Sequence, residues 1–176
     1  MIMNRIICNL LLMIFAVSAS AIEMKDVFSA MPDSVLPTLT RNNRLDMIDF
    51  KVSGMKAEVN DVFDDKSTLD TLTADYLHIT LSEAVKVEMK LLPSSSQLAD
   101  SASHVICMVM TYGKQPIESK VTLFTSQWTP LPSSPTIPDN EIATLSISSN
   151  TLTTHPMQQT EELTVFKWNG AIFNKD

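Results

Sequence analysis

Two neighbouring segments, 76–81 and 85–91, alternate between apolar and polar residues, and this pattern constrains the fold more than any other feature of the chain. Successive side chains of a β-strand point to opposite faces of a sheet, so each segment predicts a strand with one apolar and one wet face. A three-residue loop at Ser82–Ala84 would make the two apolar faces coincide, whereas a shift by one residue would set apolar against charged side chains. The facing pairs would then be Leu81 with Val85, Ile79 with Val87, Leu77 with Met89 and, on the polar face, His78 with Glu88.

A further segment, Val105–Met110, is apolar at every position, which predicts a strand that is covered on both faces. It would pair with Lys120–Thr125 through a loop that contains Gly113 and Pro116. Helices from the amino-terminal part can cover one face of this strand. The other face needs a loop, a carboxyl-terminal element or a partner chain.

Two helices are expected before the strands begin. Apolar residues in 24–31 are spaced as one helical face, and Pro32 discourages continuation of that helix. For the second helix, Asn43 is the expected N-cap, with Asp46 three residues later in a pair that resembles a capping box. Gly54 is the expected stop.

The carboxyl-terminal third predicts loops and further strands. Four prolines make 129–138 a loop, because proline resists both helix and central strand. Strands are expected in 142–147 and 163–168, and Asn169–Gly170 is typical of a type I′ turn that returns 171–173 against the preceding strand. The predicted fold class is α+β, with two N-terminal helices packed on a mostly antiparallel β-sheet of about six to eight strands.

The amino terminus predicts export. Arg5 is followed by the short apolar run Ile6–Val17 and by the small residues Ala19–Ala21, the order found in a cleavable signal peptide. We expect residues 1–21 to be the signal peptide, residues 22–176 to form a single domain, and no membrane span to remain after cleavage. The expected location is the periplasm or the cell envelope.

Composition excludes several classes of function. The formal net charge is −7 and basic residues form no run, so we expect no nucleic-acid partner. Only 3 glycines occur, and none forms a phosphate-binding loop or a nucleophile elbow. We therefore expect no cofactor. We also expect no metal, because the histidines lack zinc-ligand spacing and the acidic cluster Asp61, Asp64 and Asp65 lacks the glycine of a calcium loop. Cys107 lies in an apolar segment and is expected to be a buried hydrophobic residue rather than a catalytic thiol.

Several short motifs resemble a known family. They are Met31–Pro37, Asn42–Phe50, Leu91–Pro93, Val105–Cys107 with Thr111–Tyr112, and the pair Phe124 and Trp128. Between Met31 and Trp128 the chain is similar to a domain-of-unknown-function family of small exported proteins from Bacteroidales, and it departs from that family in the serine-rich loop Pro93–Ser103. The resemblance implies an envelope location and carries no catalytic residues, because the family has no assigned activity.

Candidate binding residues concentrate on the second helix. Polar residues crowd that helix, and they could form a recognition surface or could serve only as caps and a charged outer face. Trp128, beside two prolines, could be an exposed aromatic anchor or could pack beneath the loop. The predicted binding residues are Asn42, Arg44, Asp46, Asp49 and Trp128. His78 beside Glu88 could be an acid–base pair, but a solvated cross-strand contact is the simpler interpretation.

The leading hypothesis is a non-catalytic exported binding or assembly module of the envelope, whose partner is an envelope protein or a small ligand. A periplasmic hydrolase or glycan-processing enzyme is the alternative, because dispersed catalytic residues leave no sequence motif. A structural envelope component that pairs through a sheet edge is the third reading. The sequence does not determine the oligomeric state.

Overall fold

The computed structural model describes residues 22–95, 104–114, 117–139, 141–157 and 163–176. These residues form two helices followed by ten strands, which lie in two antiparallel sheets. The α+β class is therefore confirmed. The prediction of one sheet of six to eight strands is wrong, because the strands divide into a sheet of six and a sheet of four. The signal-peptide prediction falls on residues 1–21, which lie outside the described residues.

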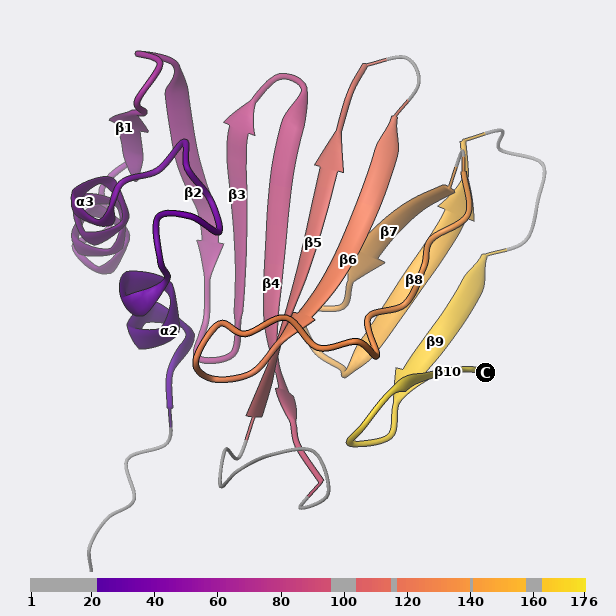
Figure 1. Cartoon of the computed structure of the whole chain (residues 1–176). Coiled ribbons are helices and arrows are strands. Elements are labelled where there is room, and N and C mark those ends of the chain that lie inside the picture. The colour runs from indigo at the N-terminus through magenta and orange to yellow at the C-terminus, as the bar shows by residue number, and fades with distance from the viewer. Residues whose placement is uncertain (1–21, 96–103, 115–116, 140, 158–162) are drawn as a thin grey trace, which may run out of the picture.

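Figure 1 shows the two helices at one edge of the larger sheet and the smaller sheet behind its other edge. The helices are α2 (Met24–Ala30) and α3 (Arg41–Val52). The larger sheet has the order β1-β2-β3-β4-β5-β6, formed by β1 (Glu58–Asn60), β2 (Lys66–Leu72), β3 (Tyr76–Ser82), β4 (Val85–Pro93), β5 (His104–Tyr112) and β6 (Glu118–Phe124). The smaller sheet has the order β10-β9-β8-β7, formed by β7 (Glu141–Leu145), β8 (Thr151–Pro156), β9 (Thr164–Trp168) and β10 (Phe173–Lys175).

The β3–β4 hairpin has nearly the predicted register. Leu77 pairs with Met89, Ile79 with Val87, and His78 with Glu88, as expected. The end of the hairpin differs, because a bulge after Thr80 sets Ser82, and not Leu81, opposite Val85. A bulge adds one residue to one strand, so the apolar faces still coincide although the connecting loop is one residue shorter than predicted.

The second helix begins three residues earlier than predicted. Its N-cap is Thr40, whose hydroxyl accepts a hydrogen bond from the Asn43 backbone at 3.2 Å. The Asn43 side chain in turn accepts a hydrogen bond from the Thr40 backbone at 3.1 Å, which completes a capping box. Asn43 is thus the third helical residue and not the cap, and the predicted pairing with Asp46 is wrong.

Each face of the larger sheet has its own core. On one face, side chains of β2 to β5 pack with α2, α3 and the segment 31–39. On the other face, side chains of β4 to β6 pack with the smaller sheet. The carboxyl-terminal strands therefore supply the second cover that β5 requires. Neither helix of the described residues is long and apolar enough to cross a membrane.

Two details correct or complete the sequence-based account. The β9–β10 connection runs from Asn169 to Ile172, and the Asn169 side chain accepts hydrogen bonds from Ala171 and Ile172, so the expected two-residue turn is wrong although the hairpin is present. Cys107 is fully buried, as predicted. Burial raises the pKa of its thiol well above the ordinary value, which opposes a nucleophilic role.

Candidate functional site

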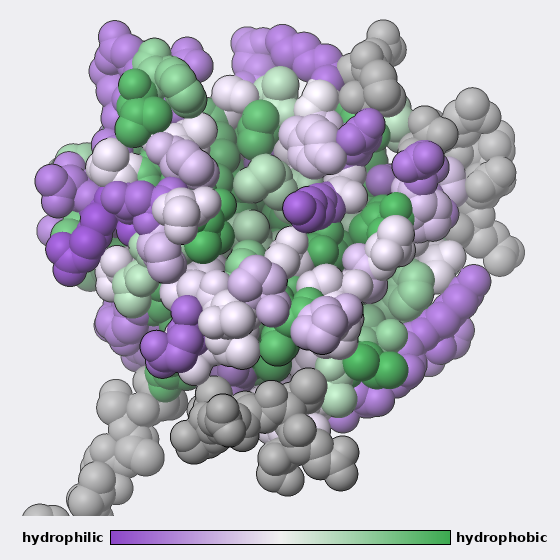
Figure 2. All heavy atoms as spheres, viewed as in Figure 1, coloured by the Kyte–Doolittle hydropathy of each residue, from purple (hydrophilic) through white to green (hydrophobic). Residues whose placement is uncertain are grey.

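An apolar groove lies on the helix-side face of the larger sheet, over β5 and β6. Its volume is about 630 Å³. Its floor and walls come from three places, namely the sheet, the segment before α3 and the loop after β6. The lining residues are Ser34, Val35, Met108, Met110, Lys120, Val121, Thr122, Phe124, Trp128, Pro130 and Ser134. Figure 2 shows this face, with hydrophobic residues in a hollow at its centre and polar residues around them.

The floor of the groove follows from strand register. In β5 and β6, Met108 pairs with Thr122 and Met110 with Lys120, so these four side chains lie on one face. Met108 is buried, whereas Met110 is only partly buried against the same core. Methionine is flexible and polarizable, and it adapts to ligands of irregular shape. The two methionines thus give the groove an apolar and deformable floor.

One wall is a loop that holds Trp128 in an unusual conformation. Trp128 has φ = +61°, in the left-handed region that non-glycine residues rarely adopt. Thr125 holds the loop together, because its hydroxyl accepts hydrogen bonds from the backbone of Gln127 and Thr129 at 3.3 and 3.2 Å. The Trp128 ring packs against Phe124 with centroids 5.5 Å apart. Such backbone strain costs on the order of 1–3 kcal/mol and persists where the surroundings impose it, often at ligand sites.

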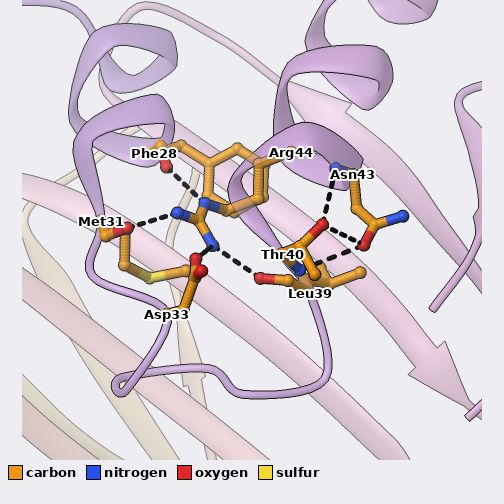
Figure 3. A network of polar contacts seen from close by, with 7 residues as sticks. All are labelled: Phe28, Met31, Asp33, Leu39, Thr40, Asn43 and Arg44. Atoms are coloured by element: carbon orange, nitrogen blue, oxygen red, sulfur yellow. Dashed lines mark hydrogen bonds and ion pairs between the residues drawn. The ribbon is translucent and has the colours of Figure 1, made fainter. Parts of the chain in front are cut away.

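The opposite wall is held by Arg44. Its guanidinium donates to the backbone carbonyls of Phe28, at 3.1 Å, of Leu39, at 2.6 Å, and of Met31. It also forms an ion pair with Asp33 at 2.8 Å. Figure 3 shows this network, in which one side chain joins the end of α2 to both ends of the segment 31–39. That segment carries Ser34 and Val35, so Arg44 fixes the wall without lining the groove.

The predicted binding residues do not come together in one place. Arg44 is fully buried, so its predicted role in a surface for recognition is wrong and its contacts are structural. Asn42, Asp46 and Asp49 are exposed on α3, and none of them lines the groove. Trp128 is 7% exposed, so it packs beneath its loop, yet it also lines the groove.

The charge distribution of the groove is simple. Among its lining residues only Lys120 is charged, and none is a carboxylate or a histidine. In the part of the chain that the structure describes, no carboxylate lies within ion-pair distance of Lys120. The groove therefore offers apolar contact and one positive charge, without a general base or a nucleophile–base pair.

A second cleft of about 330 Å³, with a mixed polar and apolar lining, lies between the two sheets and contains His78 and Glu88. These two residues lie opposite each other across the strands, as predicted, but each makes its polar side-chain contacts with other residues. His78 Nδ1 lies 3.0 Å from Asp70 Oδ2. Glu88 accepts a hydrogen bond from the Tyr76 hydroxyl at 2.6 Å and another from the Leu145 backbone at 3.1 Å. Glu88 thus joins the sheets, and both of its oxygens are occupied.

Sequence reasoning missed the main residues of the groove, which are Met108, Met110 and Lys120. A signal for them existed, because the expected pairing of β5 with β6 sets alternate residues of both strands on a common face. What the sequence did not show is that this part of the face lacks a helix above it. Exposure of the groove depends on where α2 and α3 end, which is a property of the tertiary structure.

Comparison with known proteins agrees with this fold. A solved structure described as a domain of an uncharacterized protein from Porphyromonas gingivalis is similar, with a TM-score of 0.69 and 23% identity. The match covers 89% of this chain and 98% of that one, and at this identity it shows the fold alone. Comparison with curated proteins gives no significant match. The profile of a family described as "Protein of unknown function (DUF3256)" matches residues 16–168, and the chain therefore belongs to this family.

Proposed function

We propose that the protein is an exported, non-catalytic binding module of the cell envelope, and that the groove over β5 and β6 holds an apolar ligand. The groove carries this proposal. It is large enough for part of a small ligand, since ligand pockets typically measure about 300–1,000 Å³. Its lining is mostly apolar and includes Trp128, which has a strained backbone. Opposite Trp128 lies the segment 31–39, which Arg44 holds in place, and the flexible side chains of Met108 and Met110 form the floor.

The composition of the groove supports binding more than catalysis. General acid–base chemistry needs a titratable side chain near the reacting atoms, and nucleophilic catalysis needs a base beside the nucleophile. Ser34 and Ser134 line the groove, but no histidine or carboxylate lines it with them. Ser134 is already engaged, because its hydroxyl donates to the Leu131 carbonyl and accepts from the Leu123 backbone.

The hydrolase alternative finds its best geometry at the cleft between the sheets. His78 lines this cleft and forms a carboxylate–imidazole pair, as in many hydrolases, with Asp70, which lies outside the lining. However, Asp70 also accepts a hydrogen bond from Thr80 at 2.7 Å, and Glu88 is fully occupied by Tyr76 and Leu145. These contacts stabilise the sheets, so we rank this alternative below binding. If His78→Ala abolished a hydrolytic activity of the purified protein, the order would be reversed.

Titration with N-phenyl-1-naphthylamine, a neutral probe that fluoresces in apolar surroundings, tests the groove. We expect saturable binding that Met110→Gln weakens roughly tenfold, because burial of an apolar side chain contributes about 1.5–3 kcal/mol and the substitution removes part of it. Met55→Gln is the matched control, since Met55 is 54% exposed and lies outside the groove. Absence of saturable binding, or equal effects of the two variants, would contradict the proposed site.

Export is a separate part of the proposal and has its own test. Amino-terminal sequencing of protein purified from its native cells should begin at Ile22, after removal of residues 1–21. A mature protein that still begins at Met1, or one that fractionates with the cytosol, would remove the envelope role. The binding site would be unaffected by that result. Light scattering at two concentrations addresses the third reading, because pairing through sheet edges would raise the mass with concentration.

A further inference from the structure

The position of Lys120 identifies a class of ligand. The groove side of β6 carries a row of three alternate residues, Lys120, Thr122 and Phe124. The residues between them, Val121 and Leu123, face the smaller sheet. Phe124 packs with Trp128 at one end of this row, and Lys120 stands at the other end. With a rise of about 3.3 Å per residue, the two ends are roughly 13 Å apart. The groove is thus apolar at one end and cationic at the other.

Lys120 forms no ion pair with a carboxylate within the described part of the chain. Glu118 lies on the same face two residues before Lys120, and Asp139 lines an adjoining pocket with both of them. Glu118 accepts a hydrogen bond from the Tyr112 hydroxyl, which raises the pKa of that tyrosine and leaves the carboxylate charged. These carboxylates reduce the positive potential around Lys120, but neither forms an ion pair with it. Six other lysines of the described residues have a carboxylate partner, as Lys114 does with Glu83 at 2.7 Å, whereas Lys51, Lys86 and Lys175 have none. A lysine head group beside an apolar groove, with its apolar stem along the surface, is suited to an anion attached to an apolar body.

From this arrangement we infer that the groove binds a single-chain amphiphile with an anionic head group, its chain along Met108 and Met110 and its head beside Lys120. The inference rests on the proposed binding function and specifies its ligand. It runs against the charge of the protein as a whole, because a formal net charge of −7 attracts cations over long distances. A preference for an anion would therefore indicate a local contact with Lys120, because the electrostatic field of the whole protein opposes it.

Competition for the groove with ligands of equal chain length tests the inference. The competing ligands are dodecanoate, dodecyl phosphate, dodecanol and dodecyltrimethylammonium. Each is added below its micelle concentration, and its displacement of N-phenyl-1-naphthylamine from the purified protein is measured. We expect the better of the two anions to bind roughly two- to fivefold more tightly than dodecanol, the range for a solvent-exposed ion pair. The tighter anion also identifies the head group as carboxylate or phosphate.

Two variants separate a contact with Lys120 from a change of net charge. Lys120→Met keeps an apolar stem and removes the charge, so it should abolish the preference for the anion while dodecanol still binds. Lys175→Met is the control, because Lys175 is exposed on β10 and the substitution changes net charge equally. Equal loss of preference in both variants, or equal affinity of anion and alcohol in the unmodified protein, overturns the inference.

The result also distinguishes this inference from the function on which it rests. If the neutral probe and dodecanol bind but the anions show no advantage, the groove is a binding site and the assignment of the head group is wrong. Tighter binding of dodecyltrimethylammonium than of either anion has the same meaning. If none of the ligands and no neutral probe binds, the groove itself is not the site and the proposed function fails.

Discussion

The two faces of the larger sheet carry similar apolar side chains but differ in how completely these side chains are buried. In β5, Val109 faces the smaller sheet and is 1% exposed, whereas the neighbouring Met110 faces the helix side and remains partly open. The smaller sheet covers its face with further strands, and α2 and α3 lie toward the opposite edge (Figure 1). The difference teaches that an apolar strand face becomes core or groove according to what lies above it.

One buried cation organises the cover of each face. Arg44 joins α2 and the segment 31–39 on the helix side through three backbone carbonyls and Asp33. Lys90, on β4, is 2% exposed and joins the sheets, since its ammonium donates to the Ile147 carbonyl at 2.6 Å and pairs with Asp75 at 2.8 Å. Arg44 serves more acceptors than Lys90 does, so its loss should leave more buried groups without partners.

Substitution of Arg44 should have the largest effect on either face. Arg44→Met should lower the free energy of unfolding by roughly 3–5 kcal/mol, because three buried carbonyls lose a donor and, of the three, only that of Phe28 keeps another, the Met31 backbone at 3.3 Å. Urea denaturation measures the loss. Arg44→Lys should recover only part of it, since an ammonium lacks the planar fork of a guanidinium. Arg41→Met, at an exposed position of the same helix, should change stability by less than about 0.5 kcal/mol.

Substitution of Lys90 should cost less than substitution of Arg44. Lys90→Met keeps the apolar stem in the core but leaves the Ile147 carbonyl without its donor, so we expect a loss of about 1.5–3 kcal/mol. Asp75 is half exposed and water can replace its partner, which limits the effect. Urea denaturation of Lys86→Met, an exposed lysine on the same strand, supplies the baseline. If Lys90→Met lowered the free energy of unfolding more than Arg44→Met does, Lys90 and not Arg44 would contribute more to stability.

Alkaline titration should distinguish the sheet side from the helix side. Burial, together with the hydrogen bond to Glu88 and its charge, raises the pKa of Tyr76 above its ordinary value near 10. The folded protein then holds this proton more tightly than the unfolded chain does. The stabilisation is complete below about pH 10 and is lost as the pH rises above it, with a slope of at most about 1.4 kcal/mol per pH unit.

Tyr76→Phe provides the test of this titration. The variant should lose about 1 kcal/mol at neutral pH with the hydrogen bond to Glu88, and its stability should fall less steeply above pH 10. Urea denaturation between pH 7 and pH 11 measures both effects. Tyr112→Phe is the control, because Tyr112 lies at the exposed end of β5 and should leave most of the slope in place. An unchanged slope in Tyr76→Phe would assign alkaline instability to other groups.

Much of the fold could be predicted because strand alternation and helical spacing are local. The β3–β4 register follows from one apolar face per strand, and only the bulge after Thr80 escaped the pattern. Arg44 was misplaced because charged residues are seldom fully buried. The signal that places it inside is its spacing, since Arg44 precedes the buried residues Met47 and Ile48 by three and four positions on one stripe of α3. The groove could not be predicted, because no local pattern shows where a cover ends.

The smallest expected effect concerns the exposed face of α3, which the sequence nominated as a recognition surface. Asn42, Asp46 and Asp49 lie outside the groove, so alanine at all three positions should change the free energy of unfolding by less than about 0.5 kcal/mol per site. Binding of the neutral probe and of dodecanoate should also stay unchanged. If the triple variant were fully stable but lost either ligand, α3 and not the face of β5 and β6 would carry the binding site.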